Sequence, residues 1–192
     1  LGIVGVDLSN DISLTAPANF EISLTESGTY SNSLTIARET GSKGNRNVTQ
    51  WGFEGTMDGW TAVDADVDGY NWVLGSACSG VYLEGTLTEG HDGSGDMMVS
   101  GSWTNVASTA LTPDNWLISP QVELGGSFSL WAQPQQSSYP AEHFGIYVST
   151  TGTNASDFTL LNEWTLSAAT WKQFSVDLSV YTGLTGYISG RH

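Results

Sequence analysis

The sequence has 192 residues, of which 39% are apolar and only 13% are charged. This composition supplies a buried core and excludes an intrinsically disordered chain. The acidic residues number 20 and the basic residues five, which gives a formal net charge of -15. The charge argues against nucleic acid as a partner, because proteins that bind it use basic residues to replace the counterions of the phosphate backbone.

Short runs in which apolar and polar residues alternate recur along the chain, and they predict an all-β fold. In chain order, the apolar positions of these runs are Ile12, Leu14 and Ala16; Phe20, Ile22 and Leu24; Phe128, Leu130 and Ala132; Phe144, Ile146 and Val148; and Phe174, Val176 and Leu178. Each run is typical of a strand that packs one face on a core and exposes the other. Many short antiparallel strands of this kind close into a sandwich or jelly roll.

A change in composition near residue 50 predicts two parts. Residues 38–50 contain three of the five basic residues and almost no apolar ones, and we interpret them as a linker. Residues 1–37 contain no tryptophan, whereas all eight tryptophans lie between positions 51 and 171. The first segment is long enough for only roughly three or four strands. We therefore expect part of a β module at 1–37 and a larger β-sandwich at 51–192.

No enzyme motif is visible, and we predict no catalytic residue. The Gly-x-Ser-x-Gly and His-Glu-x-x-His motifs are absent, as is a phosphate-binding glycine loop before a helix. Cys78 is the only cysteine, and we expect a small buried hydrophobe, because no base is tied to it. No run of about 18 apolar residues is present, so we expect no membrane span. A glycosidase pair of carboxylates stays open as an alternative.

The sharpest local motif is Asp64-x-Asp66-x-Asp68-Gly69. Alternate carboxylates in a tight loop can direct their oxygens at one cation, and such ligands suit calcium. The stretch from 47 to 171 contains 14 carboxylates and no Lys or Arg, so no basic residue lies nearby in sequence to neutralise them. The motif is not an EF-hand, because Gly75 occupies the twelfth position, which requires a bidentate Glu. The motif predicts a calcium site, and a solvated acidic turn is the alternative.

The tryptophans divide into core and surface candidates. Most lie beside apolar residues in strand patterns, as Trp116 does, and we expect these in the core. Trp131 instead falls on the polar side of its run, together with two serines and Gln133. Trp131, and Tyr139 in the following loop, are therefore candidate ligand contacts. Packing against a neighbouring domain explains an exposed Trp131 equally well.

Four further motifs, taken in order, resemble the cleaved-adhesin domain family, which is known from the haemagglutinin and adhesin regions of gingipain proteases. They lie at Phe53-Glu54 with 60–72, at 111–120, at 139–152 and at 187–192. Separately, the stretch from Asp7 to Thr25 resembles immunoglobulin-like segments of large secreted proteins from Bacteroidetes-type bacteria. The second resemblance covers residues 5–37.

The first resemblance implies a jelly-roll β-sandwich with bound calcium, similar to carbohydrate-binding and MAM-like modules. It also implies Glu54 as the fourth oxygen ligand beside Asp64, Asp66 and Asp68. The resemblance implies a further strand past the Arg-His pair, and we expect the 192 residues to lack it. Ser189-Gly190 stands where the family has a small residue and an aromatic one, so we expect the last strand to pack poorly.

For function, the resemblance implies a non-catalytic, calcium-binding adhesin module of a secreted or cell-surface multidomain bacterial protein. The expected partners are a host or matrix protein, or its glycan, and the neighbouring domains of the same chain. Two alternatives stay open. One is a carbohydrate-binding accessory domain of a secreted hydrolase, and the other is a spacer that calcium only stiffens.

Overall fold

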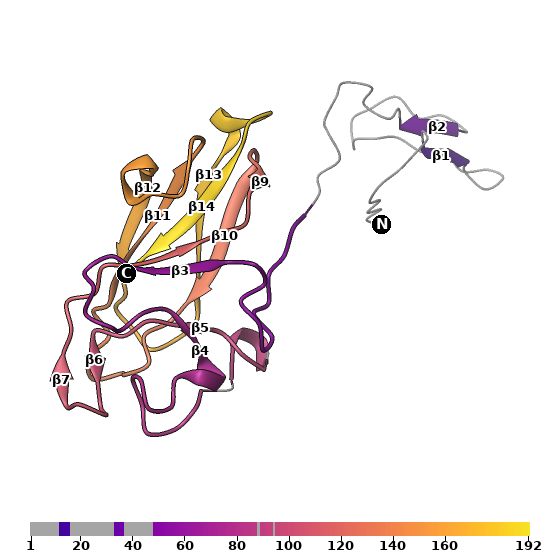
Figure 1. Cartoon of the computed structure of the whole chain (residues 1–192). Coiled ribbons are helices and arrows are strands. Elements are labelled where there is room, and N and C mark those ends of the chain that lie inside the picture. Colours follow the sequence, from indigo (N-terminus) through magenta and orange to yellow (C-terminus); the bar gives the residue numbers. More distant parts are fainter. Residues whose placement is uncertain (1–11, 16–32, 37–47, 88, 94) are drawn as a thin grey trace. The chain divides into compact units, whose positions relative to one another are not determined.

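The computed structural model describes the strands at 12–15 and 33–36 and the residues 48–192, apart from positions 88 and 94. The chain divides into two compact units, Leu1–Gln50 and Trp51–His192. In the first unit, β1 (Ile12–Thr15) pairs with β2 (Ser33–Ile36) in an antiparallel ladder (Figure 1). The rest of the expected immunoglobulin-like module, including the run that begins at Phe20, lies outside the described residues, as do the linker positions 38–47.

The second unit is built from short strands joined by loops and single 3-10 turns. The strands are β3 (Thr61–Asp64), β4 (Val73–Leu74), β5 (Met98–Val99), β6 (Trp103–Thr104), β7 (Thr109–Ala110), β8 (Asn115–Ile118), β9 (Val122–Glu123), β10 (Ser127–Ala132), β11 (His143–Ser149), β12 (Thr159–Thr165), β13 (Lys172–Asp177) and β14 (Thr185–Arg191). The 3-10 turns are η1 (Gly75–Ala77), η2 (His91–Gly93), η3 (Ala155–Asp157) and η4 (Ser179–Tyr181). Among the described residues, no helix has the length and hydropathy needed to cross a bilayer.

Two sheets make up the body of this unit. The larger one has the strand order β12-β11-β14-β8-β3, and β9 joins it by pairing with β14. β10 and β13 form a second, two-stranded antiparallel sheet. β4 pairs with β5 and β6 with β7 in two short antiparallel ladders, and Figure 1 labels these four strands away from the main sheet. The predicted all-β class is confirmed.

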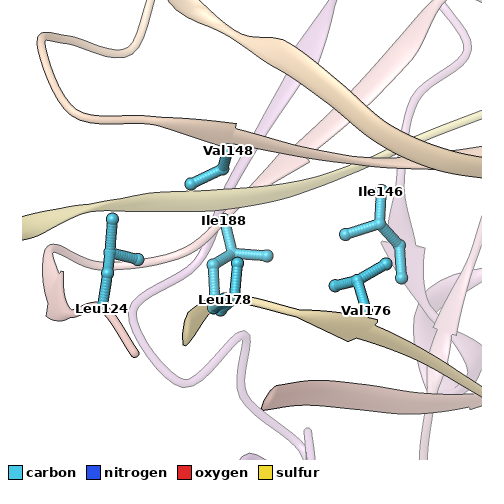
Figure 2. Packing of buried hydrophobic residues seen from close by; sticks show 6 residues of the cluster. All are labelled: Leu124, Ile146, Val148, Val176, Leu178 and Ile188. Atoms are coloured by element: carbon cyan, nitrogen blue, oxygen red, sulfur yellow. The ribbon is translucent and has the colours of Figure 1, made fainter. Parts of the chain in front are cut away.

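The core lies between the two sheets. Its buried side chains come from β11 and β14 of the larger sheet, from β13, and from the segments that follow β9 and β13. They are Leu124, Ile146, Val148, Val176, Leu178 and Ile188 (Figure 2). Phe128 and Leu130 of β10 pack against this cluster, while Trp131 on the same strand is exposed. The two-residue alternation therefore assigned the faces of β10 and β13 correctly.

The last strand corrects one expectation. β14 lies between β11 and β8, and Ser189 is fully buried there. Its Oγ donates a hydrogen bond to the carbonyl oxygen of Leu117 at 3.0 Å. The prediction of a poorly packed last strand is therefore wrong at Ser189, because this small side chain is buried and hydrogen-bonded. At Gly190, in contrast, a Cβ would have no atom within 4 Å.

Candidate functional site

The acidic loop follows directly from the end of β3. One ligand oxygen from each of Asp64, Asp66 and Asp68 lies within 4.8 Å of the other two. The backbone N–H of Gly69 donates to Asp64 Oδ2 at 2.9 Å, and the N–H of Tyr70 donates to Asp68 Oδ1 at 2.8 Å. These two bonds fold the loop back on the strand end. The structure thus brings together the three aspartates that the sequence singled out.

The electrostatics of this loop leave one oxygen without a partner. Asp64 Oδ1 is buried and accepts no hydrogen bond. Partial burial opposes ionisation of Asp64, but backbone donors led by the Gly69 N–H outweigh it and hold its pKa below the ordinary value. Desolvation within the loop, followed by the hydrogen bond with the adjacent Asp64 carboxylate, raises the pKa of the exposed Asp66. An ionised carboxylate with an orphaned buried oxygen, close to two further carboxylates, fits a hard cation such as calcium.

Val67 at the tip of this loop is strained. Its φ angle is 58°, in the left-handed region, and its side chain is 83% exposed. A β-branched residue is a clear outlier in that region, because its Cβ lies too close to the backbone. No burial of the valine side chain compensates. The backbone strain therefore accompanies the turn that gathers the three carboxylates.

We expect Val67→Asn to stabilise the second unit by about 1 kcal/mol, because asparagine tolerates the left-handed conformation. The measurement is the urea midpoint of unfolding. Val180→Asn is the matched control, since Val180 is 82% exposed and has no positive φ. A gain no larger than that of the control would show that the valine is not strained.

Glu54 lies apart from the group of three aspartates. Its Oε2 accepts a hydrogen bond from the backbone N–H of Gly95 at 2.9 Å. The neighbouring Asp96 is buried and accepts the N–H groups of Ser76 at 3.0 Å and Met97 at 2.9 Å. Burial opposes its ionisation, but the Ser76 and Met97 donors outweigh burial and lower its pKa. Glu54 therefore lies beside the loop that contains Asp96. Among the described residues, Asp64, Asp66 and Asp68 form the one group of three or more possible metal ligands whose ligand atoms lie within 4.8 Å of one another, and Glu54 is outside it.

The two candidate ligand contacts are both exposed. Trp131 is 43% exposed and Tyr139 is 78% exposed. The imidazole of His91 stacks on the Trp131 indole, with ring centroids 3.8 Å apart and 15° between the planes. Trp171 meets the same imidazole edge-on at 5.8 Å. No ring contact of the described residues links Tyr139 to this cluster, so the structure does not join the two predicted contacts into one site.

Sequence reasoning missed a relay of polar side chains at the end of β14. His192 Nδ1 lies 2.8 Å from Ser100 Oγ, and His192 Nε2 lies 3.3 Å from Glu142 Oε2. The hydrogen bond with His192 has the largest effect on the pKa of Glu142 and lowers it. Burial raises this pKa and the hydrogen bond from the Ser102 hydroxyl lowers it, so the net shift is downward. The members are 92 and 50 residues apart, so spacing gave no signal. Because the His192 side chain is only 9% exposed, we interpret the relay as a tie between the strand end and two loops.

The family description Cleaved Adhesin Domain matches residues 49–192. The chain belongs to this family. Two similar relatives come from Porphyromonas gingivalis. Hemagglutinin A is 35% identical over 157 residues, which cover 70% of this chain and 7% of that protein. A Lys-gingipain is 34% identical over 152 residues, which cover 69% of this chain and 8% of that protein. The chain thus spans less than a tenth of the length of either relative.

Solved cleaved adhesin domains share its fold. The K3 domain of Lys-gingipain from P. gingivalis has a TM-score of 0.62 at 32% identity, covering 73% of this chain and 84% of that one. The K1 domain has a TM-score of 0.59 at 35% identity, covering 70% and 80%. These domains are jelly-roll β-sandwiches, so the predicted jelly roll is confirmed for the part of the chain that they cover.

Proposed function

We propose that this cleaved adhesin domain is a non-catalytic, calcium-binding adhesion module of a secreted or cell-surface multidomain protein, and that it binds a host or matrix protein. The family and the names of its relatives support the adhesion role. The small share of those relatives that it spans supports a module among other domains. The observation that carries the calcium proposal is the buried, unpartnered Asp64 Oδ1 among three clustered carboxylates.

Asp64, Asp66 and Asp68 would hold the ion. Calcium accepts six to eight oxygen ligands in irregular geometry and keeps waters among them. Asp66 and Asp68 are exposed, so water reaches the ligand positions that the protein leaves open. When bound, the ion neutralises the mutual repulsion of the carboxylates. The expected affinity is that of an extracellular module, with a dissociation constant of about 0.1 to 1 mM.

Calcium at 10 mM is expected to stabilise the domain by about 1.4 to 2.7 kcal/mol, since it binds the folded state at ten to one hundred times its dissociation constant. The measurement is thermal melting in EGTA against 10 mM calcium. The double variant Asp64→Asn, Asp66→Asn should lose the calcium-dependent shift. Glu84→Gln, Glu89→Gln is the matched control, because it removes two exposed charges from another loop and should keep the shift.

Two results would contradict the calcium proposal. An equal shift in wild type and in the Asp64, Asp66 double variant would mean that calcium acts elsewhere or only by screening. A loss of the shift in the Glu84, Glu89 control as well would mean that total charge, not the loop, determines the response.

The adhesion role is tested by binding of the whole chain to immobilised fibrinogen and haemoglobin with calcium present. Saturable binding to either would support an adhesin that recognises protein. Failure with both proteins, together with a preserved calcium shift, would favour the stiffened spacer instead.

A further inference from the structure

The outward face of the β10–β13 sheet is a strip of mostly uncharged polar side chains, with an aromatic residue at one end and an aspartate at the other. Three cross-strand pairs form it, and every member is exposed. The pairs are Trp131 with Gln173, Ser129 with Ser175, and Ser127 with Asp177. Adjacent pairs on one face of a ladder lie close enough to contact a single ligand. The strip therefore offers hydroxyl and amide groups in a row beside an indole.

The aromatic end of this strip is held in place before any ligand arrives. His91 covers one face of the Trp131 indole, and Trp171 packs edge-on against His91. Trp131 nevertheless keeps 43% of its surface exposed. A side chain fixed in this way loses little conformational entropy on binding, which is the advantage of a preorganised contact.

The polar groups of the strip are free to bind. In the described part of the chain, the side chains of Ser129, Ser175 and Gln173 have no hydrogen-bond partner within the protein, so they exchange bonds with water. They present donors and acceptors together, because hydroxyl and amide groups can serve as both. A ligand that carries hydroxyl groups can replace that water one bond at a time.

Charge and apolar area decide what kind of ligand fits. Asp177 is the one charged member of the three pairs, and Lys172 lies on the opposite face of β13, with its Nζ 5.4 Å from the Phe174 ring centroid. With no basic residue among the pairs and a net charge of -15, anionic ligands are disfavoured. The apolar surface of the strip is a single indole, whereas the hot spot of a protein interface needs a surrounding ring of packed contacts.

We propose that this strip binds a neutral glycan, with Trp131 as the platform for one sugar ring and with Gln173, Ser129 and Ser175 as hydrogen-bond partners of its hydroxyl groups. The C–H bonds on one face of a sugar ring carry partial positive charge, and they complement the negative face of an indole. The inference deepens the adhesion role proposed above, since it assigns the recognised chemistry to the carbohydrate of a host or matrix glycoprotein.

The first test is binding of the whole chain, with calcium present, to an array of neutral, sialylated and sulfated oligosaccharides. The proposal requires binding to neutral oligosaccharides in preference to the acidic ones. Titration calorimetry with the strongest neutral oligosaccharide should then show at least about a tenfold loss of affinity in Trp131→Ala, equivalent to about 1.4 kcal/mol. Gln173→Ala should lose a smaller, several-fold factor.

Trp103→Ala is the matched control, because Trp103 is 50% exposed but lies on β6, outside the strip. It should bind like wild type. Urea midpoints of both tryptophan variants should stay close together, so that lost binding is not lost folding. Absence of any neutral hit, equal affinity of Trp131→Ala and wild type, or equal losses in both tryptophan variants would each overturn the proposal.

A second test separates this inference from the adhesion role itself. Fibrinogen is immobilised before and after enzymatic removal of its N-linked glycans. Binding that needs the glycans and Trp131 supports the strip as the recognition site. Binding that survives both deglycosylation and Trp131→Ala would leave a protein-directed adhesin standing and would refute the glycan site.

Discussion

Trp116→Ala is expected to lower the free energy of unfolding by about 3 to 5 kcal/mol, the usual cost of truncating a buried tryptophan. Trp116 is 4% exposed, and its ring packs on Tyr147 at 4.9 Å and on Phe158 at 5.4 Å. The Arg191 guanidinium lies over the same ring at 5.0 Å. The substitution therefore opens a cavity and removes several ring contacts at once.

The same substitution also weakens the ion pair between Asp114 and Arg191. The Trp116 indole N–H donates to Asp114 Oδ1 at 2.8 Å, and Arg191 holds the same carboxylate with bonds of 2.7 and 2.9 Å. These bonds from Arg191 lower the pKa of Asp114 against the opposing effect of partial burial. Removing the indole leaves Asp114 with one donor fewer and exposes the pair to water.

Trp131→Ala is the comparison for this prediction, because Trp131 is 43% exposed and contributes no buried volume to the core between the sheets. We expect Trp131→Ala to lower the free energy of unfolding, measured by urea titration, by much less than Trp116→Ala does. Equal losses in the two variants would mean that the exposed position of Trp131 on β10, or the core position of Trp116 on β8, is wrong.

The contrast between these two tryptophans shows what the sequence could predict. Alternation placed Trp131 opposite Phe128 and Leu130, and the structure exposes it while it buries them in part. Local spacing also placed Asp64, Asp66 and Asp68 together, because a tight turn gathers residues that are close in sequence. Both predictions depend on a few consecutive residues, for which backbone geometry alone determines direction.

Contacts between distant segments could not be predicted in this way. The stack of His91 on Trp131 joins η2 to β10, and the hydrogen bond between Ser100 and His192 joins residues that are 92 positions apart in the sequence. The family resemblance implied Glu54 as a ligand beside the Asp64 loop, yet its carboxylate accepts a hydrogen bond from the backbone N–H of Gly95. No periodicity records which loops cross which sheet face, since that depends on the packing of the complete sandwich.

The second substitution with a large expected effect on stability is at Gly186 of β14, a strand in the interior of the larger sheet. Gly186 is buried opposite Val122 of β9, and a Cβ at this position would overlap the carbonyl oxygen of Ser149. It would also lie 2.8 Å from Leu124 Cδ1, and Leu124 belongs to the buried core. The obstructing oxygen is part of the backbone of β11, so it cannot rotate away as a flexible side chain can.

Gly186→Ala is therefore expected to destabilise the domain by about 2 to 3 kcal/mol, near the upper end of the usual cost of overpacking. Gly190→Ala is the control on the same strand, because a Cβ there has no atom within 4 Å. The control should be neutral or stabilising by up to about 1 kcal/mol, since alanine loses less backbone entropy on folding. Urea midpoints measure both variants. If Gly186→Ala matched the control, β9, β11 and β14 would have to pack less closely around Gly186 than they do in this structure.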